Sequence, residues 1–590
     1  MLDSRLYRAA FIPLLLVLLI VAFSLTVRPR PIGTTLSPDT FSGERAFSQL
    51  NELAKRFPDR RPGAADDRAL AAAIATELRR SVPGTVRVTR FQGRTIDGKR
   101  DLINVTATRP GAPGPSIVVV AHRDAAGRSA RAELSGTAAL LELARVAGAG
   151  RLQRTITFIS TTGGSGGFAG AAEAARSLDG PVDAVITLGA VAAVGRYRPM
   201  VLGASNGLGQ APLQLQRTLQ LAVERHAGVA PGAPRAFIQG LRMAAPMTLG
   251  EQGPFLRAGL PAVLVAPTGE RAPAAGAVVS RTRLEGFGRA VLGALYALDN
   301  GPDISGEKPT QQLVLRGKVV PGWAMRLLIL ALLLPPLAVV VDAAARLRRR
   351  REPVGPWVVW ALSPAVPIIG VCVTAMLLAV TGLITVSAAA PLPPTALSLT
   401  GSVAAAVIVL VLVAGLAWLV LRPAALHAVG LNQAIRPDRL GAGVAVGAVV
   451  PLTALLLWIP NPYAAGAMVP AAHLWLWAAA PDSALRRPLT AVWLALGAVL
   501  PLIVVLTLAE LFSLSALQTP WFWTLLVAGG HQPWWTWLLW SVFWGAGIAT
   551  AMVVVRRSAP PDTPPPITVR GPASYAGPGS LGGTTSARRR

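Results

Sequence analysis

The sequence has a single cysteine, and this scarcity sets the first limits on how the protein can be built. Cys372 lies inside an apolar run, and the chain has no second thiol with which it could form an intramolecular disulfide. A metal site built from cysteine thiolates is excluded for the same reason. Histidine is also scarce, with five residues in the chain and none between His226 and His427. Any domain outside the cytoplasm must therefore be stabilised by its own hydrophobic core.

Charged residues are few for a chain of 590 residues. They make up 14% of the sequence, whereas hydrophobic residues make up 52%, which argues against a purely soluble protein. The formal net charge is +27, and many of the arginines flank apolar segments or lie in the last residues of the chain. We interpret this charge as a membrane-topology signal and not as a nucleic-acid surface. The sequence predicts a membrane protein without a nucleic-acid partner.

The amino-terminal half predicts a membrane anchor followed by a globular domain. Residues 9–27 form an apolar run long enough to span a bilayer, Arg5 and Arg8 precede it, and no clear A-x-A cleavage site follows. We expect residues 1–29 to contain a cytoplasmic start and an uncleaved transmembrane anchor. Residues 30–320 alternate between strand and helix patterns and carry charges of both signs. This pattern predicts one α/β domain.

The carboxyl-terminal half is apolar again. Residues 321–557 predict an all-α polytopic membrane domain with about seven spans. These spans are expected near residues 327–345, 357–385, 401–421, 440–459, 464–480, 489–512 and 536–555. Residues 558–590, rich in Pro, Gly, Ser and Arg, predict a disordered basic tail.

Basic connections between the apolar segments predict the orientation in the membrane. Arginines concentrate at 346–351, 422–439 and 486–487, whereas the alternate connections carry almost no positive charge. By the positive-inside rule these three connections are cytoplasmic, which places residues 30–320 outside the cytoplasm and both termini inside. We expect a multi-pass protein of the plasma membrane, and its arginine usage and tail are typical of a bacterial protein.

A histidine and an aspartate end the most apolar strand pattern of the predicted α/β domain. Residues 116–124 read SIVVVAHRD and place His122 and Asp124 at the carboxyl end of a buried strand. Open α/β sheets place their chemistry at this end. A helix pattern follows from Ser135, and the next strand pattern, RTITFIST, leads into Gly-Gly-Ser-Gly-Gly at 163–167. These elements locate a candidate site at the end of the sheet.

Five collinear segments of the predicted domain resemble the zinc aminopeptidase and glutamate carboxypeptidase family. They read RPGAADDRALAAAIATELRR, INVTATRPGAPGPSIVVVAHRD, SGTAALLELARVAG, RTITFISTTGGSGGFAGA and LGEQGPFLRAGLPAVLVAPTG. The resemblance implies a zinc-aminopeptidase-like domain with a mixed central sheet flanked by helices. It also implies a site for two zinc ions, held in the family by a His, a bridging Asp, a Glu, a second Asp and a late His, with a further Glu as general base.

Only the first part of this ligand set has a counterpart in the chain. The resemblance assigns the first His to His122 and the Asp that orients it to Asp124. The bridging Asp corresponds to Ala132, because Ser135 and Gly136 fix the register. The remaining carboxylates fall on Gly164, Ser165 and close to Gly189, and the late His has no counterpart because the chain has no histidine between residues 226 and 427.

A catalytic zinc ion needs about three protein ligands and an open position for water. His122 and Asp124 are vestigial positions in this interpretation, and we expect them to hydrogen-bond each other as a structural pair. The resemblance then implies no catalytic residue, no metal ligand and no cofactor. The alternative is a rearranged site in which Glu133 and Glu251 join His122 and Asp124 around one zinc ion, giving an active membrane-bound metallo-aminopeptidase.

Two further patterns give other hypotheses. The glycine-rich turn matches the nucleophile elbow G-x-S-x-G, with Ser165 as nucleophile and His226 as the downstream histidine. In the membrane region His473 and Glu510 are ionisable residues within apolar segments, where they either serve a transport path or reach the membrane interface. A transporter or lipid-handling membrane protein with a recruiting outer domain is therefore also considered.

The favoured hypothesis is a membrane-anchored zinc-peptidase-like protein that is catalytically inactive. It would act as a binding or assembly scaffold on the outer face of the membrane. One amino-terminal span, a ligand-poor peptidase-like domain and a polytopic half form a layout similar to the attachment subunit of the glycosylphosphatidylinositol transamidase. The expected partners are the lipid bilayer and an unknown membrane or extracytoplasmic protein or peptide.

Overall fold

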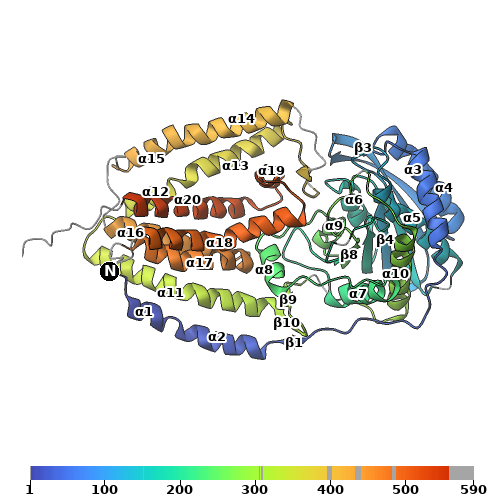
Figure 1. Ribbon diagram of the computed structural model, residues 1–590, viewed down its shortest axis with the longest axis horizontal. Coiled ribbons are helices and arrows are strands. Elements are labelled where there is room, and N and C mark those ends of the chain that lie inside the picture. The colour runs from blue at the N-terminus through green and yellow to red at the C-terminus, as the bar shows by residue number, and fades with distance from the viewer. Residues whose placement is uncertain are drawn as a thin grey trace, which may run out of the picture.

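The computed structural model divides along its long axis into an α/β domain and a bundle of helices (Figure 1). It describes residues 2–150, 152–195, 197–274, 276–304, 306, 310–387, 389–394, 401–431, 440–480 and 487–556. The predicted tail at 558–590 and residues 432–439 of the basic connection at 422–439 lie outside the described residues.

A seven-stranded sheet forms the centre of the α/β domain. Its order is β2-β3-β5-β4-β6-β8-β7. The strands are β2 (Thr85–Thr95), β3 (Gly98–Arg109), β4 (Ala112–His122), β5 (Arg154–Thr161), β6 (Val182–Leu188), β7 (Val201–Leu202) and β8 (Ala262–Val265). β4 is parallel to β5 and β6, and β6 is parallel to β8, whereas β2, β3 and β7 form antiparallel pairs at the two edges. This mixed sheet confirms the predicted fold class.

Helices surround the sheet and complete the core. They are α3 (Gly43–Arg56), α4 (Ala65–Ser81), α5 (Arg131–Ala149), α6 (Ala169–Ser177), α7 (Leu213–Ala227), α8 (Ala236–Ala244), α9 (Gln252–Arg257) and α10 (Arg281–Asn300). The apolar run from Ile117 to Ala121 in β4 has no exposed surface, as expected for a central parallel strand. Most of α5 is buried as well, so β4 and α5 form a buried support for the candidate site at the end of β4.

The helical half consists of long apolar helices and a few short ones. They are α1 (Ser4–Ala9), α2 (Ile12–Phe23), α11 (Gly322–Arg349), α12 (Gly355–Leu362), α13 (Ala365–Val380), α14 (Gly401–Leu416), the π-helical turn Ala417–Leu421, α15 (Arg422–Ala428), α16 (Leu440–Trp458), α17 (Pro462–Ala479), α18 (Arg487–Leu511), α19 (Gln518–Ala528) and α20 (Trp534–Arg556). A three-stranded sheet, β1 (Thr26–Val27), β10 (Lys318–Pro321) and β9 (Gln312–Val314), joins α2 and α11 to the α/β domain.

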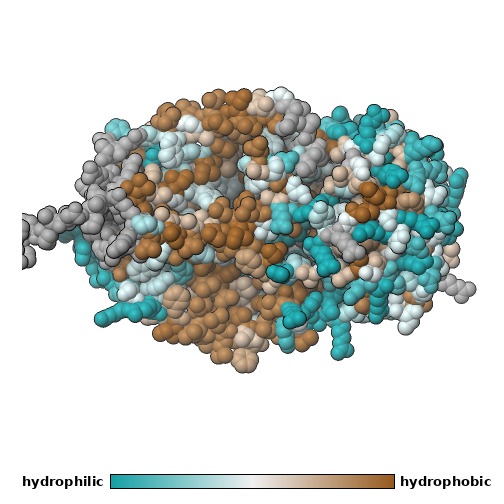
Figure 2. Space-filling model, in the orientation of Figure 1, coloured by the Kyte–Doolittle hydropathy of each residue, from teal (hydrophilic) through white to brown (hydrophobic). Residues whose placement is uncertain are grey.

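Six helical segments among the described residues are long and apolar enough to cross a membrane, and the bent pair α12 and α13 raises this number to seven. They begin with the amino-terminal helix at Ser4–Phe23, and α17, which covers the span expected at 464–480, is not among them. Hydrophobic residues cover the surface of this half, whereas polar residues cover the α/β domain (Figure 2). The long apolar helices indicate a membrane protein, and its orientation stays a prediction.

The two halves are in direct contact through α8. Met243 and Met247 share a buried apolar cluster with Tyr463 at the start of α17 and Phe522 of α19. The side-chain amide of Asn461, the N-cap of α17, donates hydrogen bonds to the carbonyl oxygens of Met243 and Ala244 at 3.0 and 3.3 Å. The end of α8 is therefore fixed to the helices.

Candidate functional site

The predicted site residues meet at the carboxyl edge of the parallel strands. β4 ends at His122, β5 leads into the glycine-rich turn at 163–167, and β6 leads to Gly189. His122, Glu133 and Glu251 line one cavity of about 80 Å³ together with this turn. We call it the sheet-edge cavity. At the start of α5 the side chain that lines it is Glu133, and Ala132 does not contribute to the lining.

Gly164 lies directly against the His122 ring. A Cβ atom at this position would lie 2.2 Å from Cγ of His122, far inside van der Waals contact. Position 164 is one of the two to which the resemblance assigns the family's carboxylate pair. The close approach of ring and backbone therefore excludes a carboxylate side chain at 164 unless His122 moves.

Asp124 holds this turn in place. Its carboxylate accepts hydrogen bonds from the backbone N–H groups of Gly164 at 2.8 Å and Ser165 at 2.9 Å, and the residue is fully buried. The expected hydrogen bond between His122 and Asp124 is wrong for the described residues, because both carboxylate oxygens face the turn instead. Asp124 is a positioning group for the backbone beside His122.

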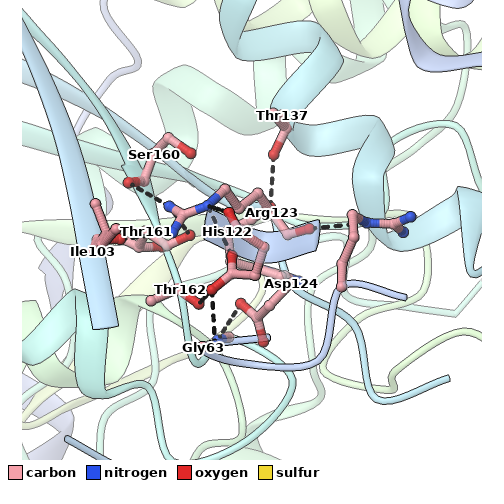
Figure 3. A network of polar contacts seen from close by, with 12 residues as sticks. Gly63, Ile103, His122, Arg123, Asp124, Thr137, Ser160, Thr161 and Thr162 are labelled. Atoms are coloured by element: carbon pink, nitrogen blue, oxygen red, sulfur yellow. Dashed lines mark hydrogen bonds and ion pairs between the residues drawn. The ribbon is translucent and has the colours of Figure 1, made fainter. Parts of the chain in front are cut away.

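His122 is paired with Glu251 instead. The two side chains approach to 3.5 Å between Nδ1 and Oε2, and the other Glu251 oxygen accepts a hydrogen bond from the Thr161 hydroxyl. The His122 carbonyl accepts from the Thr137 hydroxyl at 2.8 Å, which holds the end of β4 against α5 (Figure 3). Burial alone would lower the pKa of His122, but the neighbouring Glu251 carboxylate, together with the charges of Asp124 and Glu133, raises it to about 9. The imidazole is therefore protonated at neutral pH.

Glu133 is the second buried acid of the sheet-edge cavity. Its Oε2 atom is buried and has no hydrogen-bond partner in the described part of the chain. Burial raises the pKa of Glu133 to about 7, although the positive charge of His122 opposes this effect. The sheet-edge cavity thus contains His122, whose pKa lies above neutral pH, and Glu133, whose pKa lies near it.

These residues do not fit the zinc site that the fold family implies. In the described residues no three His, Cys, Asp or Glu side chains are grouped so that they could hold a metal ion. Ala132, Gly164 and Gly189, the positions assigned to other zinc ligands, carry no ligand atom. His122, Asp124, Glu133 and Glu251, the four residues of the rearranged site, lie in the same region, but among the described residues they are not grouped so that they could hold one metal ion.

The sequence did not predict a buried arginine network close to the sheet-edge cavity. Arg123 has no exposed surface and forms an ion pair with Asp67 at 2.8 Å. Its guanidinium also donates to the carbonyl oxygens of Ile103, Ser160 and Thr161 (Figure 3). Burial raises the pKa of Asp67, while Arg123 lowers it. This arginine ties the ends of β3, β4 and β5 to α4, and no local pattern marks an arginine as buried.

The helical half closes the sheet-edge cavity from the other side. Pro393 and Phe512 belong to that half and line the cavity. The Ser387 hydroxyl donates to the carbonyl oxygen of Gly167 at 3.2 Å. Arg271, whose guanidinium lies 4.1 Å from the centre of the Tyr197 ring, donates to the carbonyl oxygen of Glu510 at 2.5 Å. The edge at which chemistry would take place thus faces the helices at close range.

The other sequence-based candidates are not assembled into a site. Ser165 lines the sheet-edge cavity, whereas His226, the histidine that the sequence offered as its partner, lies on α7 against Gly293 of α10. His473 bonds to the Tyr7 hydroxyl at 2.7 Å and to the Leu332 carbonyl at 2.9 Å between neighbouring helices. Glu510 is exposed in the last turn of α18, beside Arg271.

Comparison with known proteins agrees with this fold. The α/β domain has a peptidase-like architecture, and residues 104–235 match the family model described as Peptidase family M28. The domain is therefore of this type, as the resemblance predicted. A zinc aminopeptidase from Bacillus subtilis is similar to the chain at 14% identity, with 43% of this chain and 95% of that chain covered and a TM-score of 0.35. A glutaminyl cyclase from Porphyromonas gingivalis gives 18% identity, 44% and 98% coverage and a TM-score of 0.32. No curated protein matches the chain.

Proposed function

We propose that this protein is a membrane-anchored pseudopeptidase. Its α/β domain binds or assembles a partner at the membrane surface and does not cleave peptides. The observation that carries the proposal is the position of Gly164, where a Cβ atom would meet the His122 ring at 2.2 Å. A catalytic carboxylate at this position would therefore need His122 to move.

The chemistry of the remaining groups supports the same conclusion. Zinc-dependent hydrolysis needs a metal-bound water and a general base. His122 is paired with Glu251, Asp124 accepts hydrogen bonds from the backbone of the turn, and among the described residues Glu133 is not grouped with other side chains that could hold a metal ion. This arrangement argues against zinc-dependent hydrolysis.

The size and enclosure of the sheet-edge cavity also favour a scaffold. A volume of about 80 Å³ is small beside the roughly 300–1,000 Å³ of pockets that bind small organic ligands. Pro393 and Phe512 narrow it from the side of the helices. A partner would therefore bind the outer surface of the domain. The layout similar to the transamidase attachment subunit supports an assembly role by resemblance.

Zinc content tests the proposal. The full chain is purified in detergent, dialysed against buffer with trace zinc, and analysed by elemental mass spectrometry beside His122→Ala and the control His226→Ala. We expect far less than one zinc ion per chain in all three proteins, and no chelator-sensitive aminopeptidase activity. One or two ions that are lost in His122→Ala and retained in His226→Ala would overturn the proposal in favour of a metallo-aminopeptidase.

Partner capture completes the test. Crosslinking in intact membranes, followed by purification of the full chain, should yield a defined protein or peptide attached to the α/β domain. If the only attachments are to lipid and to segments of the same chain, the scaffold role is wrong.

A further inference from the structure

A second cavity lies among the helices, at the end of the bundle nearest to the α/β domain. It has a volume of about 460 Å³ and is bounded by α13, α18, α19, α20 and the end of α8. We call it the helix cavity. This volume falls within the roughly 300–1,000 Å³ range of pockets that bind small organic molecules. The sheet-edge cavity is far smaller.

The lining of the helix cavity suits an apolar ligand. Trp523, Trp540 and Trp544 contribute large apolar surfaces, and none of the described residues that line the cavity carries a formal charge. The hydroxyl of Ser541 donates to the Trp537 carbonyl of its own helix at 2.8 Å, so it makes no demand on a ligand. Burying a charged group here would cost several kcal/mol without a partner. A hydrocarbon chain has no polar group to bury, so it would not incur this free-energy cost.

The lining of the cavity follows α20 for much of that helix. It extends from Gln532, just before the helix, to Trp544. The helical part of this stretch is about 15 Å long at 1.5 Å per residue. An extended hydrocarbon chain can lie along such an apolar stretch.

The walls of the cavity continue into the apolar surface of the bundle. Val505 of α18 lines the cavity, and its neighbour Leu506 is 65% exposed. Cys372 of α13 lines the opposite part, and its neighbour Val373 is 43% exposed. Figure 2 shows a band of hydrophobic surface across the helical half. A ligand can therefore enter sideways from the bilayer without crossing water.

We propose that the helix cavity binds one acyl chain of a bilayer phospholipid from the leaflet next to the α/β domain. Its headgroup stays outside, because the lining has no charged residue that could hold a phosphate. This inference does not rest on the scaffold role. It requires only that the long apolar helices lie in a membrane.

Photocrosslinking in vesicles tests the site. The full chain is reconstituted into phosphatidylcholine and phosphatidylglycerol vesicles that contain a phosphatidylcholine with a diazirine in the middle of one acyl chain. After irradiation, adducts are mapped by peptide mass spectrometry. We expect adducts on the lining stretches of α18 and α20 in excess over the exposed face of α14.

Two pairs of neighbouring substitutions separate the cavity from the general lipid surface. Val505→Trp and Cys372→Trp each place a large side chain into the cavity, whereas Leu506→Trp and Val373→Trp place it on the lipid-facing surface. We expect loss of the lining adducts in the first two variants and retention in the second two. Circular dichroism and size exclusion check folding, and the two lining sites lie on different helices in case one variant does not fold.

The contrary results are equally defined. Equal labelling of lining and exposed positions, with all four variants alike, would mean surface lipid only and would overturn the proposal. Crosslinks from the lining to a second polypeptide would overturn it too.

Discussion

The sheet-edge cavity and the helix cavity are built from opposite materials. The first is small and has three ionisable side chains, His122, Glu133 and Glu251, in its lining, with a buried ion pair of Arg123 and Asp67 nearby. The second is several times larger and is lined without formal charge. Ionisable side chains that pair with their neighbours restrict one another's movement and leave little space for a substrate. Apolar side chains that do not fill the space between helices leave room for a ligand.

This difference shows that the half with the family resemblance is not the half that contains the larger of these two cavities. The α/β domain resembles a family of zinc enzymes, yet Asp124 at its edge accepts hydrogen bonds from the turn and His122 lies in an ion pair with Glu251. The larger of these two cavities lies in the helical half. Two results would contradict this difference: a polar network at the sheet edge that contributes little to stability, or a helix cavity that is as tightly packed as the rest of the bundle.

The largest effect is expected from removing the arginine near the sheet-edge cavity. Arg123→Met leaves Asp67 buried without its partner, which should lower the free energy of unfolding by about 3–5 kcal/mol. Thermal and denaturant unfolding of the detergent-solubilised chain would measure it, with the exposed Arg68→Met as control. Adding Asp67→Leu should recover much of the loss. Equal stability of Arg123→Met and the control would show that the polar frame is loose.

A smaller effect is expected from placing a methyl group at Gly164. The new Cβ would meet the His122 ring at 2.2 Å, and such overpacking costs about 1–3 kcal/mol. His122→Ala should relieve most of this cost, so the two substitutions together would be more stable than the sum of their separate effects. The measurement is a double-mutant cycle of unfolding free energies. Strict additivity would contradict the close approach of ring and turn.

The sequence was sufficient for the parts of the site that depend on local pattern. The run from Ile117 to His122 predicted a buried strand with its chemistry at the carboxyl end, and β4 has this position. The glycines at 163–167 predicted a turn without catalytic carboxylates. Alternating apolar and basic segments likewise indicated the membrane half and most of its helices.

The rest depends on contacts between distant residues. The pairing of His122 with Glu251 joins the end of β4 to a residue beyond β7, and periodicity contains no information about it. Arg123 looked like an exposed charge because arginine usually is one, although here carbonyl oxygens of β3 and β5 surround it. Closure of the cavity by Pro393 and Phe512 needed the packing of two halves that differ in every local property.

The pH dependence of stability tests the ion pair itself. The pKa of His122 rises from 6.5 to about 9 on folding, so the pair contributes fully below pH 6.5 and its contribution is lost as the pH rises through 9. The folded pKa of Glu133 is about 7, so above pH 8 the slope comes mainly from His122. We expect the midpoint of thermal unfolding to fall between pH 7.5 and 9.5, by about 2–4 °C for each kcal/mol lost. In His122→Gln this fall should be reduced, and an unchanged fall would rule out the pair as its source.

The smallest effect is expected in the helix cavity, where a large side chain should be tolerated. Val505→Trp adds volume to a space of about 460 Å³ and should change the free energy of unfolding by less than about 1 kcal/mol. Val450→Trp in α16, whose side chain is buried among packed helices, should cost about 1–3 kcal/mol or more. Unfolding midpoints of the two variants in the same detergent give the contrast. Because the added group and the helical setting are alike, the difference reports the empty space alone, and equal losses would mean that the cavity walls are packed as tightly as the bundle core.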